Sequence, residues 1–342
     1  MKIIKGLSKI FNYMTQHIQI KEKYAKNTAG RVLTSAVLKA TPDEKISEVY
    51  GRLERELERI DILDYVYVVD NENKLIGVFS FKEFFSNKDK LVREVMKTDI
   101  ISASPHLHQE KVAHKALRHN LRAIPITEKG YFLGVVPYDK ILSIINKEAH
   151  EDFLHFGGIH KEHMKFESIL EVPLVTGIKH RLPWLLIGLI GGIFAAKIIG
   201  FFEKTLEKNL ILAAFIPLVV YISDAVGTQI ETVYVRDLSI LENLPMKKYM
   251  LKHLTITIAL ALIFSSVFFL FCFLILNLGY LSFVISLSIF VAISLETFIA
   301  LVTPYILKKF NFDPAIGSGP FTTIVSDVTS VIVYFLICSS LL

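Results

Sequence analysis

Five long apolar stretches fill the second half of the chain and restrict the folds open to it. Residues 181–342 hold 19 of the 71 charged side chains in this 342-residue chain. A bilayer core roughly 30 Å thick needs about 20 apolar residues per helix. The stretches that reach this length are Leu182–Phe201, Leu210–Val233, Leu254–Leu276, Leu281–Leu307 and Phe321–Leu342. We therefore predict an all-α bundle of five transmembrane helices.

Four carboxylates lie inside these stretches, Asp224, Glu231, Glu296 and Asp327. An ionised group facing hydrocarbon costs at least ~2.5 kcal/mol, so each is expected to face protein, water or a cation. Thr323 precedes Asp327 by four residues and would present a hydroxyl or a carbonyl beside it. Oxygen ligands alone suit a hard cation, and Mg²⁺ is commonly held by one or two carboxylates through retained waters. We predict that all five residues line a Mg²⁺ path, with Mn²⁺, Co²⁺ and Ca²⁺ also open.

Asp224 and Glu231 are seven residues apart. On a helix this spacing directs both side chains to the same side. The sequence thus predicts that the two acids form one wall of a pore.

Lys and Arg near the ends of the stretches predict the orientation in the membrane. They gather on one face, in the connection Arg236–Lys252, at Lys308 and Lys309, and at Lys179 and Arg181. The positive-inside rule places that face in the cytoplasm. Because five spans are an odd number, we predict a multi-pass protein of the cell (inner) membrane with a cytoplasmic N-terminus and an external C-terminus.

The segment 1–30 has apolar residues every three or four positions, among them Ile3, Leu7, Ile10 and Met14. This spacing predicts an amphipathic helix that lies on membrane lipids or packs on the soluble part. The net charge of +5 is spread too thinly to indicate a nucleic-acid partner.

Residues 31–145 contain one pattern twice. Pro42 and Pro105 each open a helical segment, and each helix is followed by two β-rich runs around Gly77 and Gly134, which are 57 residues apart. A β-α-β-β-α unit present twice resembles a pair of CBS modules. The resemblance implies a cytoplasmic α+β pair that often binds adenine nucleotides in its cleft.

The nucleotide pattern of that family has Gly, then Ser or Thr three residues on, then Asp three residues further. The first copy offers Gly77 and Ser80 with Glu83 in place of Asp. The second has Gly134, Pro137 and Lys140 at these positions, with Asp139 one position early. The resemblance therefore implies Ser80, Glu83 and Asp139 as ligand contacts. A folded scaffold without a ligand is the alternative.

The membrane half carries a series of short motifs in a fixed order. They are Phe215-Ile216-Pro217, Gly227-Thr228-Gln229, Arg236-Asp237, Asp313-Pro314-Ala315, Gly319-Pro320 and Ser326-Asp327-Val328-Thr329. This series resembles the membrane domain of MgtE-type magnesium channels and their solute-carrier relatives, over Pro173–Leu342. The resemblance implies a homodimer with a pore along its axis, Asp327 as the central Mg²⁺-site carboxylate and the Thr323 carbonyl nearby.

The resemblance extends upstream, because Glu148–Asp152 is similar to the start of the connecting plug helix of that family. We expect Glu151 and Asp152 to repel one another and to be bridged by abundant Mg²⁺, which would close the pore. Two departures stand out. Ser223-Asp224-Ala225 replaces a Gly-Gly-Asn stretch, and the acidic domain that precedes the CBS pair in many members is expected to be missing.

The predicted organisation is an amphipathic segment at 1–30, tandem CBS domains at 31–145, a connecting plug helix at 146–180 and the five-helix domain at 181–342. The predicted function is a divalent-cation channel or transporter and not an enzyme. Two alternatives are a CBS-containing membrane sensor without transport and an intramembrane aspartyl protease with Asp224 and Asp327 as its dyad. The protease lacks support, because such enzymes carry their aspartates in Tyr-Asp and Gly-x-Gly-Asp motifs, whereas here Asp224 follows Ser223 and Asp327 follows Val325-Ser326.

Overall fold

The structure is a computed structural model that describes residues 23–165, 168–241, 243–310, 315 and 319–342. The predicted amphipathic helix within residues 1–22 and the Asp313-Pro314 motif lie outside this range. The chain divides into two compact units, Met1–Glu148 and Ala149–Leu342. The division falls within one helix, α7 (Tyr138–Phe156).

The first unit contains two small sheets. One has β1 (Val37–Ala40), β2 (Ile62–Val69) and β3 (Leu75–Ser80), with β1 parallel to β2 and β2 antiparallel to β3; the other pairs β4 (Ala123–Glu128) with β5 (Tyr131–Pro137). The two β-rich runs predicted after each helical segment are confirmed: those around Gly77 (residues 66–69 and 75–79) are parts of β2 and β3, and those around Gly134 (residues 123–126 and 132–136) are parts of β4 and β5. β2 begins earlier than predicted because Ile62 pairs with Val37.

Short helices cover these sheets. They are α2 (Ala29–Val32), α3 (Ile46–Glu56) with η1 (Leu57–Arg59), α4 (Phe81–Ser86), α5 (Val92–Val95) and α6 (Gln109–Arg118). α3 buries Ile46, Val49 and Leu53, which share one helix face. Each copy therefore has its own apolar core. A third cluster joins the two copies, and there the rings of Tyr67 and Phe132 stack with centroids 5.1 Å apart.

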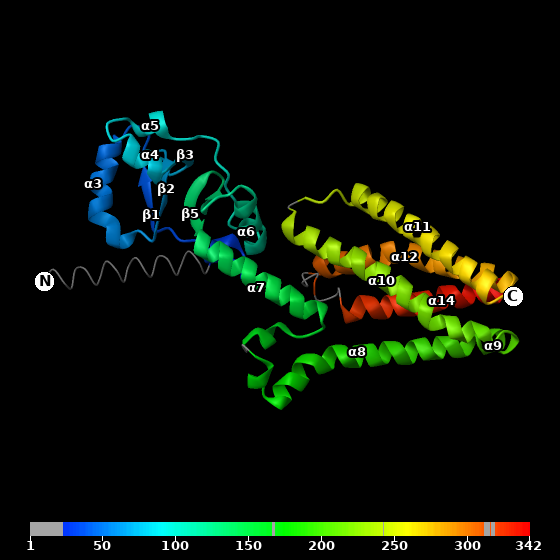
Figure 1. The fold of residues 1–342 in the computed structure, drawn as a ribbon. Helices are drawn as coiled ribbons and strands as arrows, with labels where there is room; N and C mark the ends of the chain where they lie inside the picture. Colours follow the sequence, from blue (N-terminus) through cyan, green and yellow to red (C-terminus); the bar gives the residue numbers. More distant parts are fainter. Residues whose placement is uncertain (1–22, 166–167, 242, 311–314, 316–318) are drawn as a thin grey trace. The chain divides into compact units, whose positions relative to one another are not determined.

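The second unit is a bundle of long helices (Figure 1). Within the described residues, five are long and apolar enough to span a membrane: α8 (Leu174–Phe201), α10 (Ile211–Ile240), α11 (Met246–Leu270) continuing as a π-helical turn to Ile275, α12 (Tyr280–Lys309) and α14 (Pro320–Leu341). Shorter pieces are η2 (Lys161–Lys165), η3 (Ile169–Glu171) and α9 (Glu203–Lys208). The predicted five-span bundle is confirmed. α10 is longer than the predicted apolar stretch Leu210–Val233: its last turns, which are more polar, belong to the same helix and end at Ile240.

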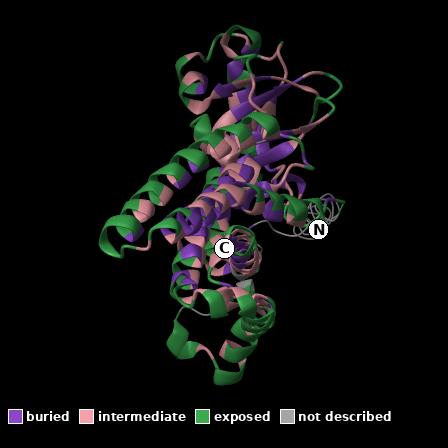
Figure 2. Cartoon of the chain, turned by 90° about the vertical axis from the view of Figure 1, so that its right-hand side faces the viewer, coloured by how far each residue is buried: buried purple, intermediate pink, exposed green. Residues whose placement is uncertain are grey.

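α14 packs against three helices, α8, α10 and α12. A Cβ placed on Gly191 of α8 would lie 2.3 Å from the Ile324 side chain of α14, so glycine permits this close contact. α12 is the most enclosed span, with 61% of its apolar window buried, whereas α8 has 11%. Figure 2 shows the long helices with buried residues toward the interior and exposed residues on the outer faces. The centre of the bundle is therefore the contact of α10, α12 and α14.

Candidate cation site in the membrane unit

α14 presents two neighbouring stripes of polar side chains. Thr322, Ser326 and Ser330 are spaced by four residues, and each is at most 3% exposed. Thr323 and Asp327 form the next stripe and are partly exposed. Since residues four apart on a helix lie above one another, α14 has one buried and one partly exposed polar stripe.

The buried stripe binds two of the four intramembrane acids. The Thr322 hydroxyl donates to Glu231 Oε1 of α10 at 2.6 Å, and the Ser326 hydroxyl donates to Glu296 Oε1 of α12 at 2.7 Å. Ser330 makes a longer contact of 3.5 Å with the same Glu296 oxygen. Glu231 is 2% exposed and Glu296 is 0% exposed. These carboxylates thus join α14 to both neighbouring helices.

The other two acids, Asp224 of α10 and Asp327 of α14, are partly exposed. The Thr323 side chain lies beside the Asp224 carboxylate. The Asp224 carboxylate also lies close enough to interact electrostatically with the carboxylates of Asp327, Glu231 and Glu296. The ion pairs Lys165–Glu162 and Arg236–Asp237 of the second unit do not involve these four acids.

The predicted common wall of Asp224 and Glu231 is only partly found. Both lie on one side of α10, but Glu231 is buried beneath Thr322 of α14 whereas Asp224 remains partly exposed. The structure therefore brings Asp224, Thr323 and Asp327 together at partly exposed positions and places Glu231 and Glu296 in the interior. Across the described residues, no three His, Cys, Asp or Glu side chains are gathered closely enough to hold a metal ion.

Gly227 of α10 makes room for the Glu296 carboxylate. A Cβ at this position would lie 2.6 Å from Glu296 Oε2. That oxygen is buried and has no hydrogen-bond partner within the described range of the chain. The close approach of α10 and α12 at this level thus depends on a residue without a side chain.

The end of α7 lies beside the start of α14. A Cβ on Gly319 would lie 2.7 Å from the carbonyl oxygen of Phe156 and 3.2 Å from that of His155. The predicted gating residues Glu151 and Asp152 lie one turn earlier on α7; Glu151 is buried and Asp152 is partly exposed. The helix ends at Phe156, before the Gly157-Gly158 pair.

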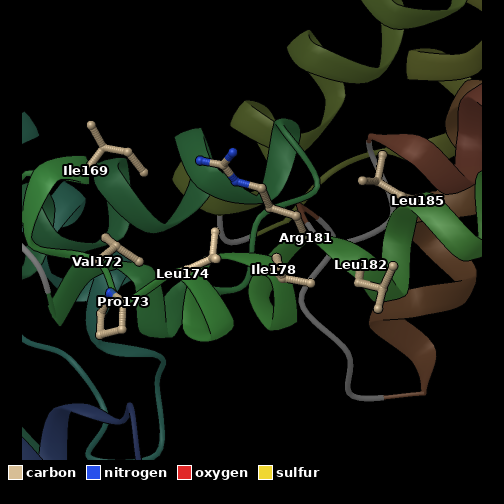
Figure 3. Close-up of a pocket in the computed structure, with 9 residues that line it drawn as sticks. Ile169, Val172, Pro173, Leu174, Ile178, Arg181, Leu182 and Leu185 are labelled. Atoms are coloured by element: carbon tan, nitrogen blue, oxygen red, sulfur yellow. The ribbon is translucent and has the colours of Figure 1, made fainter.

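A groove of about 400 Å³ follows the start of α8 (Figure 3). Apolar side chains such as Leu174, Ile178, Leu182 and Leu185 line it, together with the guanidinium of Arg181. A fixed positive charge in an apolar groove repels a metal cation. This groove therefore does not extend the candidate cation site.

The predicted nucleotide contacts of the first unit have local partners of their own. Ser80 begins α4, and the Ser80 backbone N–H and hydroxyl donate to Glu83 Oε2 at 2.9 and 3.0 Å. Burial opposes ionisation of Glu83, but the hydrogen bonds from Ser80 and the charge of Lys97 hold its pKa below the ordinary value. Asp139 is exposed in the first turn of α7. Ser80 and Glu83 thus form a helix cap.

The hydroxyl partners of Glu231 and Glu296 were missed by sequence reasoning. The signal was available, because Thr322, Ser326 and Ser330 recur every four residues in a predicted span. Their partners could not be read from sequence, since they lie 91 and 30 positions away on other helices.

A repeated α/β unit followed by five spanning helices with unpaired intramembrane acids defines a multi-pass membrane protein of the cation-transporting class. The model of the MgtE family, described as divalent cation transporter, matches residues 216–337, and the CBS domain model matches residues 29–88 and 92–147. The magnesium transporter MgtE of Enterococcus faecalis is 31% identical over 330 residues, which cover 94% of this chain and 71% of that protein. The chain belongs to the MgtE family.

A second curated relative agrees with this assignment. The magnesium transporter MgtE of Bacillus subtilis is 28% identical over 323 residues, covering 93% of this chain and 70% of that protein. Among solved structures, the soluble part of a magnesium transporter aligns at 29% identity over 39% of this chain and 52% of that chain, with a TM-score of 0.38.

Proposed function

We propose that this protein carries Mg²⁺ across the membrane along the partly exposed face formed by Asp224, Thr323 and Asp327. One observation carries the proposal: two carboxylates lie partly exposed on spanning helices, and neither has an ion-pair partner among the described residues. An ionisable residue within a span marks an ion pathway by default. The matched relatives are named magnesium transporters, which supports the same cargo.

The number and kind of these oxygen ligands suit a hydrated ion. Mg²⁺ gives up water reluctantly and is usually bound by one or two carboxylates while it keeps several waters. Asp327 would supply the principal charge, Asp224 a second charge, and Thr323 a neutral oxygen. Mn²⁺ and Co²⁺ can use the same oxygen ligands.

We further propose that a second copy of the chain completes the pore. The face that carries Asp327 is open on one protomer, and an axis of symmetry beside it would bring two such carboxylates to one ion. Residues 1–180 would lie in the cytoplasm, because Lys and Arg are concentrated at that end of the spans.

We propose that the end of α7 controls access to this path. Its last turn lies against Gly319 at the start of α14, and Glu151 and Asp152 stand one turn earlier. Mg²⁺ bound near these acids would favour a closed state. Adenine-nucleotide binding by the CBS pair, through Ser80, Glu83 and Asp139, stays a prediction.

The test is ion flux into liposomes that contain the purified full-length protein. Mg²⁺, Mn²⁺, Co²⁺ and Ca²⁺ are compared with and without a proton or Na⁺ gradient, which separates a channel from a coupled carrier. Asp327→Ala is expected to abolish Mg²⁺ flux, and the double change Glu151→Gln with Asp152→Asn is expected to relieve inhibition by internal Mg²⁺. Flux that survives Asp327→Ala would contradict the proposed path, whereas a parent protein that shows no flux would favour the sensor alternative.

A further inference from the structure

We infer that Glu231 and Glu296 are positioning residues: they bind the hydroxyl stripe of α14 and thereby fix the helix rotation that presents Thr323 and Asp327 to the cation, without contacting the cation themselves. This inference rests on the proposed function. It gives two of the predicted cation ligands a different role.

The bonded residues stand directly beside the residues that face outward. Thr322, bonded to Glu231, is followed by Thr323, and Ser326, bonded to Glu296, is followed by Asp327. A helix advances about 100° per residue. Fixing two hydroxyls on successive turns therefore fixes the direction of both outward side chains.

The two hydroxyls depart from the pattern of other helical hydroxyls in this bundle. Ser288, Ser294, Thr232 and Thr255 each donate to the carbonyl four residues earlier in their own helix. Such local bonds hold a side chain against its own helix and do not constrain the orientation of neighbouring helices. The bonds of Thr322 and Ser326 instead reach α10 and α12, so they specify how α14 is rotated against both.

The glutamates are poorly placed to meet a hydrated cation. Both are nearly inaccessible, and one oxygen of each accepts a hydroxyl hydrogen bond. The second oxygen of Glu296 lies over Gly227, where even a methyl group would not fit. By contrast, Asp224 and Asp327 remain partly exposed. The four acids thus separate into an inner pair that holds a helix and an outer pair that is open to an ion.

The experiment compares variants of the full-length protein in liposomes, measuring maximal Mg²⁺ flux and the Mg²⁺ concentration that gives half of it. Glu296→Leu removes the acceptor at similar volume and is expected to reduce maximal flux by about tenfold, in the range of one lost buried hydrogen bond. Glu296→Gln keeps an oxygen acceptor for Ser326 and is expected to restore flux to within about threefold of the parent protein. Half-saturation should remain unchanged in both.

Ser326→Ala provides a milder variant that removes only the donor, in case Glu296→Leu fails to fold. It is expected to lower maximal flux severalfold without shifting half-saturation. The matched control is Tyr334→Phe, which deletes another buried bond of α14, from the Tyr334 hydroxyl to the Leu212 carbonyl at 2.9 Å. This change is two turns past Asp327 and is expected to leave flux intact.

The outcomes separate the two proposals. If Glu296→Gln loses flux as fully as Asp327→Asn, or raises half-saturation, Glu296 is a cation ligand and the positioning role is overturned. Equal losses in Tyr334→Phe and Ser326→Ala would also overturn it, because general packing would then explain both. Retained flux in Asp327→Asn would overturn the proposed function and this role together.

Discussion

The carboxylates of the two units of this protein have different kinds of interaction partner. In the first unit, partly buried or surface acids are paired with fixed cations: Glu44 with Arg52, Asp64 with Arg122, and Glu83 with Lys97. In the second unit, the acids within the spans are bonded to hydroxyls or left partly exposed, and the ion pairs described there lie outside this group.

The difference separates structural charge from functional charge. A carboxylate beside a fixed guanidinium is already neutralised, and its pair contributes to stability without attracting a mobile ion. A carboxylate within a bilayer and without such a partner keeps its attraction for a cation that can enter and leave. Under the proposed function, transport requires that Asp224 and Asp327 have no lysine or arginine beside them, as is the case among the described residues.

The largest of these effects is expected when a fixed positive charge is placed beside the partly exposed acids Asp224 and Asp327. Thr323→Lys places an ammonium beside Asp224 and should lower Mg²⁺ flux by about 100-fold, equivalent to ~2.7 kcal/mol. Thr323→Ser keeps the hydroxyl and serves as the control. Flux measured in liposomes decides the matter, and a lysine variant that still conducts Mg²⁺ would show that the path lies elsewhere.

A smaller effect is expected from filling the space between Gly227 and the Glu296 carboxylate. Gly227→Ala introduces a methyl group against Glu296 Oε2 and should destabilise the protein by ~1–3 kcal/mol, as overpacking does in cores. Gly200→Ala is the matched control, because nothing lies within 4 Å of a Cβ there. Thermal unfolding in detergent measures both variants, and equal behaviour would contradict the close packing of α10 and α12.

Removing Asp224 tests how much the second partly exposed acid contributes to Mg²⁺ transport. Asp224→Ala should weaken Mg²⁺ flux by about threefold to tenfold and reduce discrimination against other divalent ions, since rings of acids set selectivity in cation pores. Competition of Ca²⁺ and Mn²⁺ with Mg²⁺ in the flux assay gives the readout. An unchanged rate together with unchanged selectivity would assign all of the binding to Asp327.

The smallest effect on transport is expected in the first unit. Burial by itself raises the pKa of Glu44, but the hydrogen bonds from Arg52 and Thr41 and the Arg52 charge bring it below the ordinary value of 4.5. Glu44→Gln should therefore lower stability by about 1 kcal/mol and leave Mg²⁺ flux unaltered. The exposed Glu54→Gln is the control.

The pH dependence of this pair follows from the sign of the shift. A lowered folded-state pKa stabilises the fold above pH 4.5, and this stabilisation is lost as the pH falls through the folded-state value. Glu44→Gln should remove that part of the acid sensitivity. Unfolding of the full-length protein measured between neutral and acidic pH tests this, and identical acid profiles would exclude a stabilising role for the pair.

Much of the fold follows from local patterns in the sequence. Apolar length sets the five spans, and the repeated runs around Gly77 and Gly134 set the strands of both CBS copies. The glycine pair Gly157-Gly158 marks the end of α7 at Phe156, but the sequence did not show that one helix continues through the predicted boundary between residues 145 and 146. The bounds of β2 depend on pairing with Val37, which is a tertiary contact.

The candidate site was predictable only as a set of residues. Helical spacing placed Asp224 and Glu231 on one side of α10, but exposure depends on which neighbour covers each turn. Thr322 of α14 covers Glu231 and leaves Asp224 partly exposed. The sorting of the four acids into inner and outer pairs is thus a property of how three helices are rotated, and this information is spread over distant parts of the chain.

The hydroxyl–carboxylate bonds between helices also bear on how such proteins diverge. The partners Thr322 and Glu231 are separated by 91 positions, and Ser326 and Glu296 by 30. If evolution replaces one glutamate by an apolar residue, the hydroxyl of its Thr or Ser partner stays buried without its acceptor. Selection then favours replacement of that Thr or Ser as well. Across descendants of this chain, the members of each pair should be inherited or lost together.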